Sequence, residues 1–331
     1  MRDIVQVSVV IVNWNGLRLM EQCLGALTEQ TFSEFEIIVV DNGSTDGSVD
    51  WLGEHHPSVR VIRNDENLGF AAANNQAIRA STAEFVVTLN NDTRVEPGWL
   101  EALVRAVQPD PSVGMGACKM LFADRPEMIN STGINLDRVG IAWDRSGGER
   151  DDAAETEPRE VFGPSAGAAL YRRAMLDEIG SFDERFFMYL EDVDLAWRAR
   201  LAGWRCLYVP SSRVYHVHSA SAREGSPFKN RLLGRNKVWT IAKNYPLDKL
   251  LLNLPLILLY DVAAVVFAVV ARGDTYALRG RWEGLRGLRE VWQDRRSIQA
   301  LLKRNVGRPW TAYLSPLVPP WRVPSRFRHL A

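Results

Sequence analysis

Apolar residues in the first 120 positions of the chain follow two alternating patterns. Short runs rich in Val and Ile are typical of buried strands, and the stretches between them have the periodicity of amphipathic helices. This alternation predicts consecutive βαβ units and a parallel sheet covered on both faces. The predicted strands are 7–12, 36–40, 59–62 and 84–89, and the predicted helices are 17–29, 48–54, 70–80 and 97–107.

The middle of the chain is less regular. Residues 121–160 are polar, acidic and weakly periodic, which predicts loops or edge hairpins over the mouth of a site. Order returns at 163–170, and a helix, the acidic group 191–194 and a second helix follow. Gly203 is placed to end that second helix.

Residues 250–271 form an apolar stretch that is long enough to cross a bilayer. Its few polar groups recur at helical spacing on one stripe, and Pro255 and Asp261 argue against a simple crossing helix. Three interpretations stay open, namely a helix lying in the membrane interface, a soluble core or oligomer helix, and a true span. Residues 279–304 form a second segment, basic and amphipathic. Together, segments 250–271 and 279–304 predict a C-terminal region that associates with a membrane.

Charge is unevenly distributed although the 331 residues have a formal net charge of zero. Residues 272–331 hold 13 Lys or Arg against 4 Asp or Glu, so this tail favours an anionic partner. Its Trp, Leu and Val content fits an anionic membrane surface better than nucleic acid. The three cysteines show no CxxC spacing and the N-terminus has no signal-peptide pattern, so we expect a cytoplasmic protein, peripheral on the inner face of the membrane.

Polar residues follow the predicted strands, where ligands bind in open α/β sheets. The turn 41–47 begins with Asp41 and Asn42, which can hydrogen-bond a nucleobase or ribose, although Asn and Gly also favour plain turns. After the fourth strand comes Asp92, which could hold a divalent cation against a pyrophosphate leaving group. An Asn-Asp turn is the simpler alternative for that position.

A second group of carboxylates, 191–194, follows the aromatic run 186–189 at the start of a helix. Helix capping explains acidic residues there, but an aromatic surface beside a carboxylate also describes a sugar subsite with a general base. His216 and His218 alternate along an extended segment, so only one of them is expected to face the site. That imidazole could complete a metal site with Asp92, or it could be structural.

Taken in this order, the segments resemble the glycosyltransferase family 2 enzymes of the GT-A fold, in their rhamnosyltransferase-like branch. The motifs are Val-Ser-Val-Val-Ile-Val-Asn-Trp-Asn at 7–15, Val-Val-Asp-Asn-Gly-Ser-Thr-Asp-Gly-Ser at 39–48, Asn-Leu-Gly-Phe-Ala-Ala-Ala-Asn-Asn at 67–75, Leu-Asn-Asn-Asp at 89–92 and Phe-Met-Tyr-Leu-Glu-Asp-Val-Asp-Leu-Ala-Trp-Arg at 187–198. The resemblance implies an α/β, Rossmann-like, doubly wound mixed sheet with a C-terminal helical membrane-associating extension. The implied domains are 1–245, divided into a nucleotide-sugar half (1–120) and an acceptor and base half (121–245), and the extension 246–331.

The same resemblance implies roles for individual residues. Asp192 would be the catalytic base, and Asp92 with His216 would hold Mg²⁺ or Mn²⁺. The DxD position reads Asn90-Asn91-Asp92, so a single carboxylate remains there. The metal would then be held more weakly, or mainly through the donor's own phosphates. The donor would meet Val12, Asn13, Trp14, Asp41, Asn42, Asn67, Gly69 and Asn91, and the acceptor would meet Glu191, Asp194, Gly167, Ala168 and Tyr189.

The resulting prediction is an inverting glycosyltransferase that moves L-rhamnose from dTDP-β-L-rhamnose to a glycan or polyprenyl-diphosphate-linked acceptor in cell-envelope polysaccharide synthesis. UDP-galactose, UDP-galactofuranose and UDP-N-acetylglucosamine remain alternative donors. An oxidoreductase would need a GxGxxG turn, which residues 13–16 do not supply. A nucleotidyltransferase would need a basic residue in the first loop, where only Arg18 is near, and a non-catalytic scaffold would not need both Asp92 and Asp192.

Overall fold

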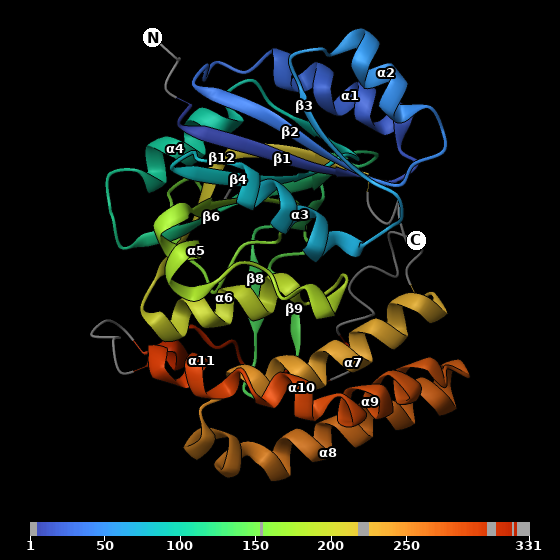
Figure 1. The fold of residues 1–331 in the computed structure, drawn as a ribbon. Helices are drawn as coiled ribbons and strands as arrows, with labels where there is room; N and C mark the ends of the chain where they lie inside the picture. Colours follow the sequence, from blue (N-terminus) through green and yellow to red (C-terminus); the bar gives the residue numbers. More distant parts are fainter. Residues whose placement is uncertain (1–4, 153–154, 218–224, 303–308, 320, 323–331) are drawn as a thin grey trace.

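A computed structural model describes residues 5–152, 155–217, 225–302, 309–319 and 321–322 (Figure 1). The first half alternates strands and helices, as the apolar pattern predicts. The strands are β1 (Val7–Asn13), β2 (Phe35–Asn42), β3 (Arg60–Asn64), β4 (Phe85–Asn90) and the short β5 (Thr93–Val95); the helices are α1 (Leu17–Thr28), α2 (Ser48–His55), α3 (Gly69–Ala80) and α4 (Trp99–Val107).

Most of the strands form one mixed sheet, in the order β10, β12, β6, β11, β4, β1, β2, β3. The additional strands of the second half are β6 (Val113–Phe122), β7 (Ile129–Ser131), β10 (Arg159–Glu160), β11 (Ala168–Arg172) and β12 (Arg205–His216). Strands β1 to β4 pair in parallel, whereas β11 runs antiparallel between β4 and β6. A small hairpin of β8 (Ile134–Leu136) and β9 (Ala142–Asp144) stands apart, in the region predicted as loops or hairpins.

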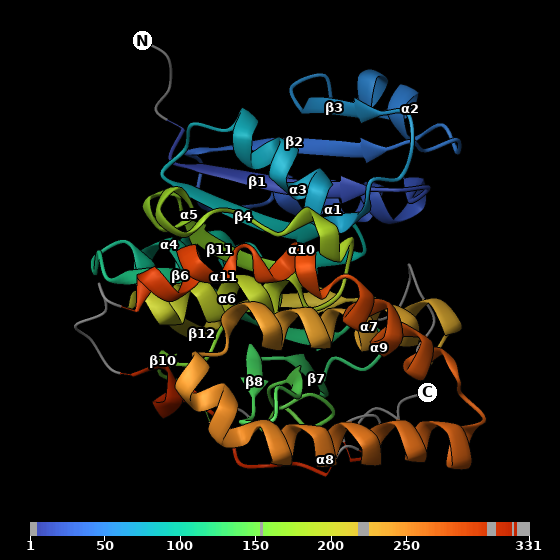
Figure 2. The ribbon, with the colours of Figure 1, turned by 60° about the horizontal axis from the view of Figure 1, so that its bottom comes forward.

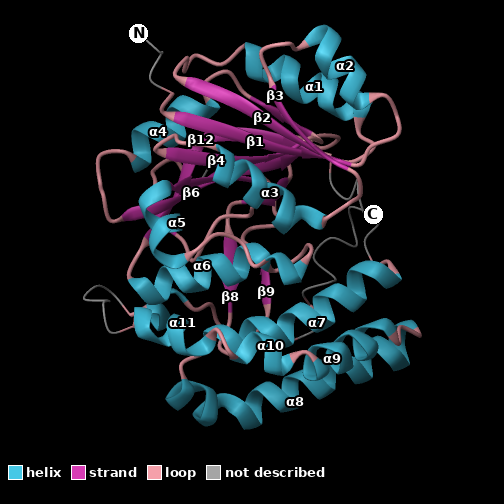
Figure 3. Ribbon diagram, in the orientation of Figure 1, coloured by secondary structure: helices cyan, strands magenta, loops and turns pink. Residues whose placement is uncertain are grey.

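Alternating side chains of each central strand enter two hydrophobic cores. Val9 and Ile11 pack with α1 and α4 on one face, and Val10 packs with α3 on the other. The second face is completed by α5 (Arg173–Ile179) and α6 (Glu191–Ala202). Figure 3 shows the sheet between these helices, so the doubly wound arrangement is confirmed.

Helix α6 begins after a 3-10 turn, η1 (Glu184–Phe186), and ends at Gly203, as predicted. The following strand β12 leads to α7 (Pro227–Asn244), which crosses beneath α6. Two long helices, α7 and α8 (Leu247–Arg272), and the shorter α9 (Tyr276–Arg286) lie side by side (Figures 1 and 2).

The companion segment predicted at 279–304 is not one continuous amphipathic helix. It breaks at Gly287 into α9, α10 (Leu288–Trp292) and α11 (Arg295–Leu301), and a final 3-10 turn, η2 (Trp310–Tyr313), follows. Ile298 and Leu301 are buried in the same core as α6, whereas Trp282 and Trp292 are exposed. The helices after residue 245 therefore share a core with the sheet domain, and only part of their apolar surface faces outward.

Candidate active site

The carboxyl ends of β1, β2 and β4 meet at one edge of the sheet because β1 pairs in parallel with both neighbours. Asn13 lies opposite Asp41 in the register, and its Nδ2 donates to Asp41 Oδ1 over 3.1 Å. Asn91 Nδ2 donates in turn to Asn13 Oδ1 over 2.8 Å. Three residues predicted to bind the donor thus form one hydrogen-bonded row at the edge where open α/β sheets bind ligands.

Two residues that the sequence reasoning missed complete this row. A Cβ at Gly16 would lie 2.2 Å from Asn91 Nδ2, so only glycine allows the close approach. Ser44 Oγ accepts from Asn13 Nδ2 over 3.1 Å and from the amide of Asn15 over 2.9 Å, tying the first two loops together. The Trp14 ring is 50% exposed beside them and is available for stacking, while Val12 is partly buried.

A buried amide cluster supports the next donor loop. Asn42 is 1% exposed, and its Nδ2 lies 3.3 Å from Asn67 Oδ1 and 3.2 Å from the carbonyl oxygen of Gly69. Asn42 Oδ1 accepts from Asn64 Nδ2 over 2.9 Å. The structure therefore brings Asn42, Asn67 and Gly69 together as predicted, but it places Asn42 in the interior, where its amide braces the loop instead of lying on the open edge.

Strand pairing brings His216 to Asp92. The end of β12 runs antiparallel to β5 with His216 opposite Thr93, and His216 Nε2 lies 3.2 Å from Asp92 Oδ1. His216 Nδ1 lies 3.0 Å from Asn130 Oδ1. If the Nδ1–H group donates a hydrogen bond to this oxygen, Nε2 is unprotonated and its lone pair faces Asp92.

This pair fits a divalent cation. Asp92 is 6% exposed and its Oδ1 accepts no hydrogen bond from the residues that the structure describes, which is a costly state for a buried carboxylate without a cation. Two ligand atoms about 3 Å apart are spaced like neighbours around one metal ion. Within the described ranges no cluster of three His, Cys, Asp or Glu forms such a site, and His218 lies outside these residues.

Asp192, at the start of α6, has the environment of a general base. It is partly buried; its Oδ2 accepts from the amide of Ala166 over 3.2 Å and its Oδ1 from the amide of Val193 over 2.8 Å. Burial raises the pKa of Asp192 to about 6, with a further contribution from the charge of Asp144, while the Ala166 hydrogen bond opposes the rise. A carboxylate with such a pKa is ionised at neutral pH and still accepts a proton readily.

The neighbouring Glu191 is 6% exposed, and its Oε2 has no hydrogen-bond partner. Burial, followed by the charge of Asp192, raises the pKa of Glu191 well above its ordinary range. Burial and the neighbouring charge thus both favour the protonated form of Glu191.

A short strap, residues 166–167, connects the Asp92 region to Asp192. The amide of Asn90 donates to the carbonyl oxygen of Gly167 over 2.8 Å, and the adjacent residue, Ala166, donates to Asp192. The Asp92 region and Asp192 are thus held at two sides of the same strap, with partly exposed Gly167 between them.

The model of the family described as "Glycosyl transferase family 2" matches residues 8–180. The chain is a member of this family. A rhamnosyltransferase of Mycobacterium tuberculosis, named N-acetylglucosaminyl-diphospho-decaprenol L-rhamnosyltransferase, is 31% identical over 242 residues, which cover 66% of this chain and 78% of that protein. The protein is accordingly a glycosyltransferase, as the resemblance of the motifs predicted.

Solved structures confirm the GT-A fold of this family 2 glycosyltransferase. GalNAc-T7, in a complex with UDP, GalNAc and Mn²⁺, superposes with a TM-score of 0.62 at 18% identity, and the match covers 88% of this chain and 57% of that one. A mannosyltransferase of Pyrobaculum calidifontis, in a complex with GDP-Man and Mn²⁺, gives a TM-score of 0.52 at 20% identity and covers 91% and 87%.

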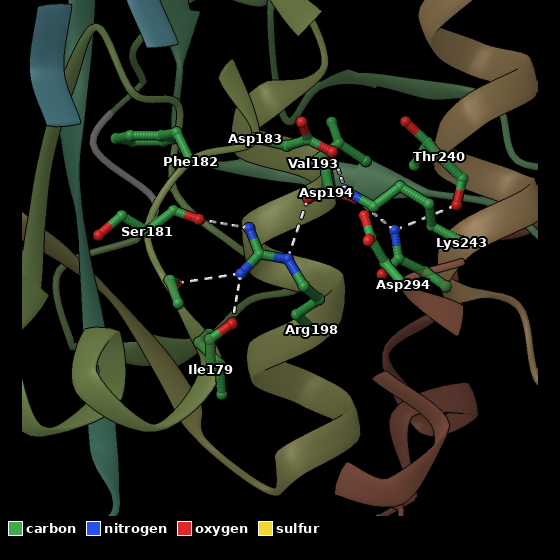
Figure 4. Close-up of polar contacts among 12 residues, drawn as sticks. Ile179, Ser181, Phe182, Asp183, Val193, Asp194, Arg198, Thr240, Lys243 and Asp294 are labelled. Atoms are coloured by element: carbon green, nitrogen blue, oxygen red, sulfur yellow. Dashed lines mark hydrogen bonds and ion pairs between the residues drawn. The ribbon is translucent and has the colours of Figure 1, made fainter. Parts of the chain in front are cut away.

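Two predicted acceptor contacts do not fit the structure of this glycosyltransferase. Ala168 is 1% exposed inside β11 and packs in the core, so it cannot reach an acceptor. Asp194 is fully buried, with Oδ1 accepting from Asn244 and Lys243 and Oδ2 from Arg198 (Figure 4).

Those partners give Asp194 a structural role. Burial acts to raise its pKa, but the charges of Lys243 and Arg198 outweigh burial, so the pKa of Asp194 is lowered. The same Arg198 holds the carbonyl oxygens of Ile179 and Ser181, and Lys243 also contacts Asp183 (Figure 4). Both oxygens of Asp194 are used in joining α6 to α7 and to the loop before η1.

The loop that leads into the base helix has an unusual backbone. Phe187, Tyr189 and Leu190 all have positive φ, at 66°, 68° and 64°. Each non-glycine residue in this region costs roughly 1–2 kcal/mol, so the surrounding structure has to hold the loop in place. The partly exposed Tyr189 lies in this loop, and the Lys229 ammonium is 5.4 Å from the centre of its ring.

Proposed function

We propose that this glycosyltransferase moves L-rhamnose from dTDP-β-L-rhamnose to a hydroxyl group of a glycan or polyprenyl-diphosphate-linked acceptor, with inversion at the anomeric carbon. The sugar and the acceptor class rest on the printed activity of the mycobacterial relative, which is 31% identical. The observation that best supports sugar transfer is the strap 166–167. It contacts Asp192, whose pKa is raised, on one side and the segment that leads to the Asp92–His216 pair on the other.

The chemistry needs one proton acceptor and one stabilised leaving group. Asp192 takes the proton of the acceptor hydroxyl as its oxygen attacks the anomeric carbon. The bond between that carbon and the diphosphate oxygen breaks on the opposite face, and its electron pair leaves with the nucleoside diphosphate. A single displacement of this kind turns a β-L-rhamnosyl donor into an α-L-rhamnoside.

Asp92 and His216 would hold Mg²⁺ or Mn²⁺, which neutralises the diphosphate as it departs. The row of Asn13, Asp41 and Asn91 lies where the nucleoside would be bound, and Trp14 would stack on it. Glu191, uncharged when protonated, limits the negative charge next to the base. Gly167 and Tyr189, both partly exposed near Asp192, are the remaining acceptor contacts of the proposal.

The C-terminal helices would bring the enzyme to an anionic membrane surface on the cytoplasmic side. Helix α8 is long and apolar enough to cross a membrane by length and composition alone. The middle of α8 is attached to the neighbouring helices, because Asp261 accepts from Lys237 of α7 over 3.0 Å and from Arg281 of α9 over 2.8 Å. These ion pairs favour a helix that lies in the interface over one that leaves the domain to span.

The exposed surface of α8 is apolar between Leu251 and Val270, and its exposed charges, Asp248, Lys249 and Arg272, lie at the two ends of the helix. Exposed Trp282 lies on the neighbouring helix α9, and the Arg286 guanidinium stacks over the Trp282 ring at 4.1 Å. This combination suits the headgroup region of an anionic bilayer. The exposed apolar residues of α8 are Leu247, Leu251, Leu252, Leu254, Leu258, Leu259, Val262, Val266 and Val270.

Vesicle flotation tests the membrane surface. Wild-type protein should float with vesicles that contain phosphatidylglycerol, and Leu252→Glu combined with Val262→Glu should reduce the bound fraction about tenfold. Val5→Glu, at an exposed valine before β1, is the control and should bind like wild type. Equal flotation of the double variant and the control would remove α8 as the contact.

Transfer and thermal-shift assays test the reaction itself. A panel of dTDP-rhamnose and UDP sugars, each with and without Mn²⁺, is offered with a short polyprenyl-diphosphate-linked N-acetylglucosamine. Stabilisation and turnover with dTDP-rhamnose alone would support the proposal, and turnover with one UDP sugar would replace the donor. If no sugar nucleotide binds under any metal condition, the proposed reaction is wrong.

A further inference from the structure

Helix α7 contacts the left-handed loop 186–190 through one buried amide. Asn236 is 0% exposed, and its Nδ2 lies 3.1 Å from the carbonyl oxygen of Phe186, 2.9 Å from that of Met188 and 2.7 Å from that of Tyr189. We propose that Asn236 is a positioning residue, which holds this loop and thereby sets the place and the environment of Asp192. The inference rests on the proposed role of Asp192 as the base.

The backbone of the loop requires such a donor. Positive φ at Phe187, Tyr189 and Leu190 shapes a loop in which the carbonyl oxygens of Phe186, Met188 and Tyr189 all lie near the Asn236 amide. Buried carbonyl groups without donors are costly. The two Nδ2 protons of Asn236 serve the oxygens of Met188 and Tyr189 at the shorter distances, whereas the oxygen of Phe186 also accepts from the amide of Met188 over 2.8 Å and from Arg235. The loop therefore keeps its shape through a side chain that is far away in the sequence.

Arg235 fixes the direction of that amide. Arg235 Nε donates to Asn236 Oδ1 over 2.9 Å, so Nδ2 must face the loop. Arg235 Nη2 donates to the carbonyl oxygens of Arg185 and Phe186 over 3.1 Å and 2.8 Å. The two neighbouring residues of α7 together contact the carbonyl groups of residues 185, 186, 188 and 189.

The held loop touches both sides of the reaction centre. Its last residue, Leu190, directly precedes Glu191 and Asp192 in α6. On the donor side, the carbonyl oxygen of Phe187 accepts from the amide of Ala71 over 3.1 Å, and the Phe187 ring lies against Gly69. A shift of the loop would move the base and loosen the turn proposed for the donor.

Helix α7 itself is well anchored. Lys243, two turns after Asn236, joins Asp183 and Asp194 in the buried ion cluster of Figure 4. Lys237 contacts Asp261 of the apolar helix α8. The residue next to Asn236 is thus tied to the surface proposed to meet the membrane, which makes α7 the physical link between that surface and the base loop.

The test compares Asn236→Ala and Asn236→Asp with Thr240→Val, one turn along the same helix. Thr240 is also buried, but its hydroxyl donates only to the carbonyl oxygen of Asn236 within α7. We expect both Asn236 variants to lose about 20-fold or more in kcat, with binding of the nucleoside diphosphate changed less than about threefold. Thr240→Val should stay within about twofold of wild type.

Two further measurements separate positioning from plain loss of stability. The acidic limb of the kcat profile should move by about half a pH unit or more to lower pH in Asn236→Ala, because a loosened loop admits water to Asp192 and lessens its burial. Amide hydrogen exchange at 187–192 should be about tenfold faster than in Thr240→Val. A pH profile and exchange rates equal to those of Thr240→Val would overturn the inference.

Hydrogen exchange needs no substrate, so it decides the role of Asn236 even if the reaction is assigned wrongly. Absence of turnover by the wild type with every sugar nucleotide would refute the proposed function alone. Faster exchange in the Asn236 variants together with unchanged kcat would refute the link between the loop and the base.

Discussion

Replacing Asp192 with asparagine should abolish transfer and at the same time stabilise the protein at neutral pH. The side chain keeps its shape but loses the charge and the ability to take a proton. We expect kcat to fall about 100-fold or more, which is the usual contribution of a positioned general base. Binding of the sugar nucleotide should persist, because no donor contact is removed.

The gain in stability follows from the pKa of the carboxyl group. Burial raises this pKa from 3.8 to about 6, so the folded chain holds the proton more tightly than the unfolded chain. The contribution of Asp192 to stability is therefore most favourable below about pH 4, declines between about pH 4 and 6, and reaches its full cost above about pH 6. A difference of about two pKa units corresponds to about 3 kcal/mol.

Asparagine removes this cost but gives up one acceptor. The hydrogen bond from the amide of Ala166, at 3.2 Å, is the weaker of the two that Asp192 accepts, and its loss costs about 1 kcal/mol. The net gain at pH 7.5 is thus about 2 kcal/mol. At roughly 2 °C per kcal/mol for a chain of this size, Tm should rise by about 4 °C. At pH 4 the gain should be absent, because the wild-type carboxyl group is then protonated in the folded chain.

Asp194→Asn is the matched control, since the same change is made two residues later in the same helix. Its pKa is lowered by Lys243 and Arg198, so the ionised form contributes stability at neutral pH, which is lost on acidification. That variant should lower Tm at pH 7.5. The reasoning is refuted if Asp192→Asn retains more than about a tenth of the wild-type kcat, or if its Tm at pH 7.5 falls as that of Asp194→Asn does.

Three other changes test separate parts of the structure. Asp92→Ala should remove the stabilisation that a sugar nucleotide gains from Mn²⁺ and lower kcat about 100-fold; equal thermal shifts with and without metal in the wild type would count against the metal site. Gly69→Ala should cost about 2–3 kcal/mol in urea unfolding, because a Cβ there would lie 2.6 Å from the Phe187 ring at a φ of 86°; an unchanged midpoint would contradict this close contact. Asp261→Leu should cost about 3 kcal/mol by leaving Lys237 buried without its ion pair, and adding Lys237→Met should recover most of that loss. No recovery in the double variant would show that the ion pair is not the cause.

Local patterns along the chain were sufficient to predict the helices and strands of the first half of the fold. Strand and helix periodicities predicted β1 to β4 and α1 to α4, with β3 displaced by one or two residues. The edge of a parallel sheet gathers the residues that follow each strand, so Asn13, Asp41 and Asn91 could be expected to meet. The end of α6 at Gly203 was also predictable, because a glycine that ends a helix is a local feature of the sequence.

Other parts of the site depended on contacts between distant segments. His216 could be named as a ligand candidate, but only the pairing of β12 with β5 places it 3.2 Å from Asp92. Asp194 looks the same as Asp192 in sequence, and only the approach of Lys243 from α7 shows that it belongs to an internal ion cluster. Asn236 carries no motif at all, since its importance arises from the carbonyl groups of a loop about 50 residues earlier.

The sequence by itself thus determined the layered α/β architecture and the edge where such sheets bind ligands, because periodicity and strand order are properties of short segments. Its motifs also named the two carboxylates proposed as metal ligand and base. The tertiary structure decided which carboxylate is partnered and which is left with a raised pKa. It also decided which face of α8 stays exposed, because burial and ion pairing are set by neighbours that strand pairing and helix packing bring from far along the chain.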